Sequence, residues 1–232
     1  MTKVFNFQEG EVLLVDKPLH WTSFQVVKKI RNLVTKKAPK NTKVGHAGTL
    51  DPLATGLLIV CTGKKTKEID LYQGMEKEYT GELLLGKTTP SYDGETEVDR
   101  EYDISHINET LLQETTQKFM GEIEQFPPIF SAVKVEGKRS YDLARQGKEV
   151  EVKIRTITIR EFEITSVVLP KVYFRVTCSK GTYIRSLAHD FGQALGAGAY
   201  LTGLVRTRIG EFSLENAYTL EDLTIAIRGE AR

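Results

Sequence analysis

The sequence predicts an α+β fold, a mixed and largely antiparallel sheet flanked by helices. Segments that alternate apolar and polar residues, typical of half-buried strands, are interleaved with segments whose apolar residues recur at helical spacing. Most strand pairs are separated by turns too short for the crossover that a parallel pair requires. No internal repeat, low-complexity tract or Pro/Gly/Ser-rich linker divides the 232 residues, so we expect residues 1–232 to form a single domain.

The elements of the first half follow from apolar spacing. A short apolar strand spans residues 12–15 and ends at Asp16. Thr22 or Ser23 can then cap a helix. The residues on its apolar face are Val26, Val27, Ile30, Leu33 and Val34. Residues 79–85 form the next predicted strand, because every second residue of this segment shares one face.

The second half is read in the same way. Residues 90–94 form a turn-rich loop, and residues 108–120 form a helix stopped by Gly121. Strand character returns at 132–135, which precedes a turn at 136–137, and alternation predicts strands over 150–155 and 172–178. A helix starts near Thr182, with core-spaced Ile184, Leu187, Ala188, Phe191 and Leu195.

Composition excludes several classes of protein. The chain has 32 Lys and Arg against 31 Asp and Glu and is 40% hydrophobic, which excludes intrinsic disorder. No apolar run approaches the roughly 20 residues of a membrane span. The first residues lack the pattern of a signal peptide. We therefore expect a soluble cytoplasmic protein that does not bind a membrane.

The cysteines and histidines do not match a metal site. Cys61 and Cys178 lie far apart in apolar stretches, and the histidines are scattered at His20, His46, His106 and His189. We expect both cysteines to behave as small core residues, and the protein to use neither a metal nor a cofactor.

Basic residues cluster locally although the net charge is only +1. The first cluster, within residues 28–43, holds seven Lys and Arg and no acidic residue. A second lies within residues 134–148, and Arg206 with Arg208 forms a third. Each cluster is either a solvated face or a set of phosphate contacts.

Asp51 has two readings. Followed by Pro52, it is typical of a helix N-cap with proline at the first helical position. A helix starting there would, however, meet Gly56 in its second turn. Asp51 is also the sole carboxylate between Lys28 and Lys67, and a basic neighbourhood keeps an aspartate ionised and nucleophilic.

Arg185 is the second unusual residue. It falls in the first turn of the predicted helix near Thr182, where the helix dipole disfavours a cation by roughly 0.3–1 kcal/mol. It is either a tolerated surface arginine or the partner of an anion, such as a phosphate or a carboxylate elsewhere in the fold. An Asp51–Arg185 pair would explain both residues, and Tyr183 could place a ring beside it, unless Tyr183 is simply a core aromatic.

At these residues the sequence resembles the TruB family of bacterial tRNA pseudouridine synthases. Residues 45–56, GHAGTLDPLATG, are similar to the family's catalytic motif. The accompanying similar segments, in order, are VDKP at 15–18, KEY at 77–79, PIFSAVK at 128–134, YDLARQG at 141–147 and CSKGTYIR at 178–185. The resemblance covers residues 11–223.

The resemblance implies a pseudouridine-synthase-like fold and isomerisation of uridine at position 55, in the TΨC loop of tRNA, without a cofactor. It implies that Asp51 is the nucleophile, Arg185 its ion-pair partner and Tyr79 the tyrosine that stacks on the base. Tyr183, Leu204 and His46 match substrate-contacting positions; His46 as a loop residue and Leu204 as a core leucine are the alternatives. Asp51 attacks C1′ of the sugar, or acts through C6 of the uracil or a glycal intermediate.

The chain departs from the family in two places. It ends at Arg232 without the family's C-terminal RNA-binding PUA domain, so we expect the single domain to be catalytic and the Lys28–Lys43 cluster to bind the TΨC arm. The family's Thr-Asp-Thr-x-Asp segment reads TPSYD at 89–93. We expect a monomer with no obligate protein partner. The alternative functions are a pseudouridine synthase for another RNA and a non-catalytic RNA-binding protein.

Overall fold

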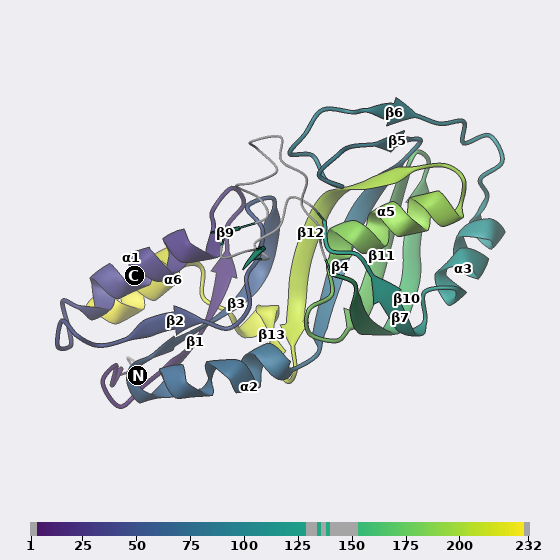
Figure 1. The fold of residues 1–232 in the computed structure, drawn as a ribbon. Coiled ribbons are helices and arrows are strands. Elements are labelled where there is room, and N and C mark those ends of the chain that lie inside the picture. The colour runs from purple at the N-terminus through teal and green to yellow at the C-terminus, as the bar shows by residue number, and fades with distance from the viewer. Residues whose placement is uncertain (1–3, 129–133, 136–137, 140–152, 230–232) are drawn as a thin grey trace. The chain divides into compact units, whose positions relative to one another are not determined.

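The computed structural model describes residues 4–128, 134–135, 138–139 and 153–229, and the chain divides into two compact units (Figure 1). Unit 1 comprises Met1–Tyr79 and Leu204–Arg232, and unit 2 comprises Thr80–Gly203. Unit 1 is thus built from both ends of the chain. Two strands, β4 (Lys77–Leu85) and β12 (Ala199–Ile209), contribute residues to both units.

In unit 1, strand β3 (Ala54–Thr62) is the centre of the sheet. It pairs antiparallel with β1 (Val12–Lys17) and β2 (Val44–His46) and parallel with β12, whose Leu204 lies opposite Ala54. The short β13 (Phe212–Ser213) pairs antiparallel with β12. Nearly all of β3 is buried, as its apolar sequence predicts for a central strand.

Helix α1 (Ser23–Val34) begins as the sequence predicts. The Thr22 hydroxyl accepts from the backbone N–H of Gln25, and the Gln25 side chain accepts from the backbone N–H of Thr22, a complete capping box. The apolar face of α1 shares a core with β1, β3 and helix α6 (Leu220–Arg228). The remaining helical segments of the unit are η1 (Gly63–Glu68), α2 (Ile69–Gly74) and η2 (Leu214–Asn216).

In unit 2, β10 (Arg155–Val168) pairs antiparallel with both β7 (Gly121–Gln125) and β11 (Lys171–Cys178). Its short strands are β5 (Lys87–Thr88), β6 (Arg100–Glu101), β8 (Lys134–Val135) and β9 (Lys138–Arg139). Among the described residues, unit 2 also contains helices α3 (Glu109–Gln117) and α5 (Ile184–Ala194). Contacts between the rings of Phe162, Phe174 and Phe191 form the centre of its core.

The α+β prediction is confirmed, but the strands β3 and β12 and most of β10 were not predicted, and several other elements differ at their ends. Helix α3 ends at Gln117 rather than at residue 120. The strand predicted over 150–155 is wrong at residues 153–154, which have no regular structure and where Ile154 is 48% exposed; β10 runs instead from Arg155 to Val168, and residues 150–152 lie outside the described residues. Residues 132–133 and the turn predicted at 136–137 also lie outside them, and residues 134–135 are a strand as predicted.

Both cysteines are buried, as predicted. No helix in the described part of the chain combines the length and the apolar character needed to cross a bilayer. Nor does any group of three or more His, Cys, Asp or Glu among the described residues have an arrangement that could hold a metal ion.

Candidate active site

Asp51 lies in an irregular loop between β2 and β3, not at the start of a helix. The N-cap reading is therefore wrong, because after a two-residue turn the chain enters β3 at Ala54. Gly56 in this strand has φ +102°, and a Cβ there would meet the backbone of Arg206 at 2.4 Å. Asp and Pro are also typical turn residues, and Gly56 was the sequence signal against a helix.

The start of α1 holds this loop from one side. The Ser23 hydroxyl accepts from the backbone N–H of Leu50 at 2.9 Å and lies 3.2 Å from the Leu50 carbonyl, to which it donates. The backbone N–H of His20 donates to the Pro52 carbonyl at 2.8 Å. Asp51 itself is half-buried between these two anchored residues.

Two buried cations lie near Asp51. The Lys17 ammonium donates to the carbonyls of Pro18 (3.0 Å) and Trp21 (2.6 Å). The Lys17 pKa is lowered to about 8, mainly by burial and in part by the Arg206 charge, against the attraction of Asp51. Arg206 is 1% exposed, so both readings of it, as part of a solvated face and as a phosphate contact, are wrong. Its guanidinium donates hydrogen bonds to backbone carbonyls inside the protein.

His46 is the last residue of β2 and is half-buried. It pairs with Val60 of β3, and the following residue, Ala47, donates its backbone N–H to Ile59. Burial lowers the pKa of the His46 imidazole, and the Arg206 charge acts in the same direction. The ring is therefore mainly neutral at pH 7, so it would meet RNA as a hydrogen-bonding or stacking group rather than as a cation.

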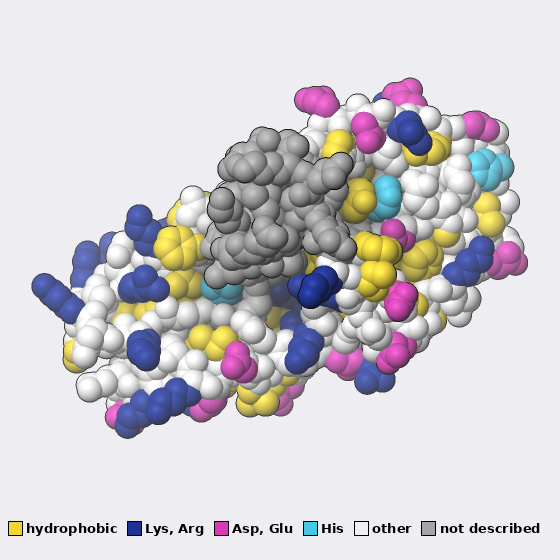
Figure 2. All heavy atoms as spheres, in the orientation of Figure 1, with side chains coloured by type: hydrophobic (Ala, Val, Ile, Leu, Met, Phe, Trp, Pro, Cys, Tyr) yellow, Lys and Arg dark blue, Asp and Glu magenta, His cyan; other side chains and the backbone are white. Residues whose placement is uncertain are grey.

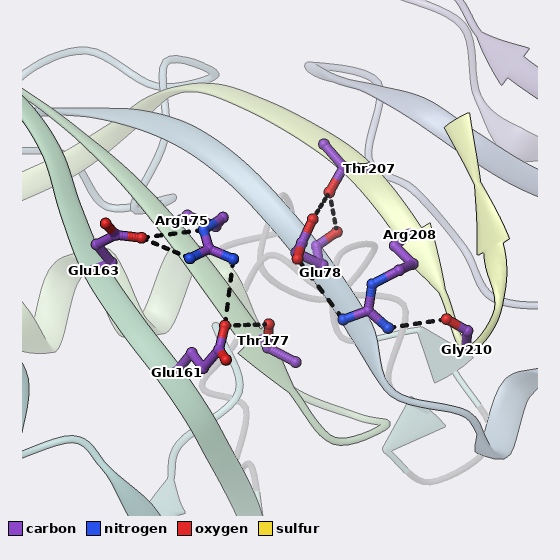
Figure 3. A network of polar contacts seen from close by, with 8 residues as sticks. All are labelled: Glu78, Glu161, Glu163, Arg175, Thr177, Thr207, Arg208 and Gly210. Atoms are coloured by element: carbon purple, nitrogen blue, oxygen red, sulfur yellow. Dashed lines mark hydrogen bonds and ion pairs between the residues drawn. The ribbon is translucent and has the colours of Figure 1, made fainter. Parts of the chain in front are cut away.

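Tyr79 and Leu204 occupy the two strands that both units share. Tyr79, on β4, is 8% exposed. The neighbouring Glu78 accepts from the Thr207 hydroxyl at 2.7 Å and lies 3.7 Å from the Arg208 guanidinium, which holds β4 to β12 (Figure 3). Leu204 is half-buried in register with Ala54, three residues after Asp51. Unit 1 thus carries His46, Tyr79 and Leu204 on connected strands and Asp51 on the loop between two of them.

Arg185 lies in the first turn of α5, as predicted, and is buried in unit 2. Its Nη1 donates to the Ser91 carbonyl at 3.2 Å, and its Nε lies 3.6 Å from the Asp93 carboxylate. The predicted anion near Arg185 thus includes a carboxylate of unit 2. Tyr183 is half-buried, its backbone N–H and carbonyl both bonded to the Gln125 side chain.

Asp93 is a residue that the sequence analysis did not assign. Its carboxylate also accepts from the Ser91 hydroxyl at 2.6 Å and from the Glu95 backbone N–H at 3.0 Å, so the anion is fixed before it meets Arg185. The sequence signal was indirect: a cation in the first turn of a helix favours a nearby anion, and Asp93 is the last residue of the TPSYD segment, which keeps the final Asp of the family pattern. Asp51 and Arg185 belong to different units, so their pairing stays a prediction.

Comparison with known proteins identifies the class. Among relatives, tRNA pseudouridine synthase B of Flavobacterium johnsoniae is 58% identical over 91% of this chain and 93% of its own length. That of Phocaeicola vulgatus is 57% identical over 93% and 92%. Among solved structures, a Cbf5–Nop10–Gar1 complex matches with a TM-score of 0.71 and 34% identity, over 94% of this chain but 54% of the matched one. The fold is that of the pseudouridine synthases.

Two family models assign the chain more narrowly. Residues 36–184 match the N-terminal domain of TruB family pseudouridylate synthases, and residues 185–230 match the C-terminal domain of tRNA pseudouridylate synthase B. The chain belongs to the TruB family. The first match contains the whole Asp51 loop and Tyr79, and the second begins at Arg185.

Proposed function

We propose that this chain converts uridine 55, in the TΨC loop of tRNA, to pseudouridine, with Asp51 as the nucleophile. The observation that carries the proposal is the 54–58% identity, over 90–94% of the chain, to relatives named tRNA pseudouridine synthase B. The loop that holds Asp51 in a basic, half-buried position supports it, because such surroundings suit a reactive carboxylate.

The reaction is an isomerisation and balances without an added reagent. The N1–C1′ bond of the uridine breaks, a C5–C1′ bond forms, the C5 proton is released and N1 takes up a proton. Attack by Asp51 at C1′ would give a glycosyl ester like that of retaining glycosidases. The other routes begin at C6 of the uracil or pass through a glycal. Asp51 is required in each, so a test of this residue does not depend on the route.

The remaining residues are proposed to bind the extruded nucleotide. Base flipping costs a few kcal/mol, and stacking on Tyr79 would return about 1–3 kcal/mol. Tyr183 and Leu204 would line the pocket, and His46 would contact the RNA beside it. Arg185 is proposed to pair with Asp51 in the active enzyme. A guanidinium has five N–H donors, so Arg185 can serve Asp93, Ser91 and a second carboxylate together.

We further propose that the chain acts as a monomer, in the cytoplasm, without an obligate protein partner or cofactor. The solved relatives include complexes with other proteins, whose matched chains are nearly twice as long as the part that this chain covers. We expect the purified chain to be active on transcribed tRNA in the presence of a metal chelator. We also expect the active protein to have the mass of a monomer in solution. A requirement for a second protein would contradict this part of the proposal.

The Asp51→Asn variant tests the function directly. We expect folding and tRNA affinity to stay near those of the wild type, because the amide is nearly isosteric. We expect tritium release from C5-labelled uridine to fall by several orders of magnitude, because the nucleophile is lost. Asp70→Asn, which changes an exposed aspartate of α2, is the matched control and should be fully active.

The same assay separates the alternative functions. A non-catalytic RNA-binding protein would bind tRNA equally well in wild type and variant and release no tritium in either. A synthase for another RNA would be inactive on both full tRNA and its isolated TΨC stem-loop, yet active on total cellular RNA. Substantial turnover by Asp51→Asn would remove Asp51 from the mechanism while leaving the function in place.

A further inference from the structure

Every backbone carbonyl of the loop from Gly48 to Pro52 has a hydrogen-bond donor, although the loop has no regular secondary structure. Two of these donors belong to one residue distant in sequence. The Arg206 Nη2 donates to the Gly48 carbonyl at 3.2 Å and its Nη1 to the Thr49 carbonyl at 3.4 Å. Its Nε donates to the Leu57 carbonyl in β3 at 2.8 Å. One guanidinium therefore ties the loop before Asp51 to the strand after it.

The remaining carbonyls are bound locally or by α1. The Ser23 hydroxyl donates to the Leu50 carbonyl. The backbone N–H of Ala54 donates to the Asp51 carbonyl at 3.1 Å, and the backbone N–H of His20 donates to the Pro52 carbonyl. Arg206 and Ser23 thus hold the residues immediately before Asp51, from β12 and from α1 respectively. Both side chains are buried, so removing either leaves backbone carbonyls of the loop without their present donor.

The backbone around Arg206 is shaped for this contact. Gly56 lies opposite Arg206 in the parallel β3–β12 pair, and a Cβ there would meet the Arg206 backbone nitrogen at 2.7 Å. Gly48 has φ +97°, so its left-handed conformation turns the loop. Arg208, two residues along the same strand, instead donates to Gly210 and pairs with Glu78.

We infer that Arg206 is a positioning residue for Asp51, with Ser23 as its counterpart on the other side of the loop. The inference rests on the proposed role of Asp51. Arg206 acts through the backbone: its planar fork fixes the carbonyls of Gly48 and Thr49 and so the direction in which the Asp51 carboxylate projects. A lysine, as a point donor, cannot hold three carbonyls in this arrangement.

The test compares Arg206→Lys with Arg208→Lys, each measured well below its midpoint of thermal unfolding. For Arg206→Lys we expect kcat on tRNA to fall about ten- to hundredfold, with tRNA affinity within about twofold of the wild type. Hydrogen exchange should accelerate in peptides covering 48–53 and stay unchanged in unit 2. Arg208→Lys should keep wild-type kcat and loop exchange.

Ser23→Ala gives a second test that does not depend on a buried charge. We expect a smaller fall in kcat than for Arg206→Lys, again with faster exchange at Leu50 and unchanged tRNA affinity. The inference is overturned if Arg206→Lys folds and retains wild-type kcat. If Arg206→Lys does not fold, the inference is overturned if Ser23→Ala folds and retains wild-type kcat. Wild-type enzyme that releases no tritium would instead refute the proposed function, so the two failures are distinguishable.

Discussion

At the scale of single residues, Lys17 shows how the site balances charge and burial. It is fully buried beside the Asp51 loop, and two carbonyls accept from its ammonium. Burial is the largest influence on its pKa and lowers it from 10.5 to about 8. Near physiological pH the side chain is thus a cation close to its titration point, near the Asp51 carboxylate.

This shift predicts a pH dependence of stability. Because the folded pKa lies below the unfolded value, the unfolded chain binds more protons between about pH 8 and 10.5. The free energy of unfolding therefore gains a rising contribution across this window, by at most about 1.4 kcal/mol per pH unit. Relative to wild type, Lys17→Met should lose that contribution in urea titrations from pH 7 to 10.5.

Lys64→Met is the control for this measurement, because Lys64 is an exposed lysine paired with Glu9. It gives the effect on stability of losing a lysine at the surface, against which the Lys17→Met difference is compared at each pH. Parallel pH profiles of wild type and Lys17→Met would show that Lys17 titrates normally in the folded protein.

At the scale of elements, helix α1 joins the Asp51 loop to the basic cluster within residues 28–43. Its buried face belongs to the core and its N-terminal turn carries Ser23. Its outer face carries Phe24, 64% exposed, and Lys28 one turn later. Figure 2 shows Lys and Arg side chains gathered over this helix. Two of the basic residues have structural roles, since Arg31 donates to Val44 and Lys37 to Arg228.

An exposed aromatic ring beside a lysine is typical of a surface that stacks on bases and contacts phosphates. We therefore expect Phe24→Ala to weaken tRNA binding about tenfold, measured by filter binding. Lys28→Ala should lower the slope of log affinity against log salt by about 0.7–0.9. Leu71→Ala, which removes another exposed apolar side chain of unit 1, is the control and should bind as the wild type does. Equal affinities for all three would assign the RNA to another surface.

At the scale of the whole molecule, the sequence predicts what is local. The capping residue and apolar face of α1, the buried faces of β4 and β11 and the position of Arg185 in a first turn all follow from short-range patterns. The roles of the site residues were predicted from the family resemblance, because residue composition does not specify the chemistry on which these roles depend. The sequence did not predict the contacts of Arg206 and Asp93, since each joins segments some 90 to 160 residues apart.

The division into two compact units was also not predicted from the sequence. The family models divide the chain after residue 184, whereas the compact units divide at Tyr79 and Gly203. Strands β4 and β12 continue from one unit into the other, and the boundary is marked only by an interruption of the buried alternation, at Gly81 in β4 and at Gly203 in β12. A single catalytic domain over residues 1–232 stays a prediction.

This division predicts the effect of shortening the chain. Residues 204–229 supply unit 1 with the β12 partner of β3, the Arg206 guanidinium and α6, whose Leu223 and Ile227 are buried against α1 and β1. Losing either leucine-sized side chain alone costs about 2–5 kcal/mol, comparable to the entire stability of many domains. A chain ending at Gly203 should therefore lose hydrogen-exchange protection in α1, β1 and β3, whereas a chain lacking only residues 230–232 should keep it. Full protection of β3 in the shorter chain would mean that unit 1 is stable without its C-terminal segment.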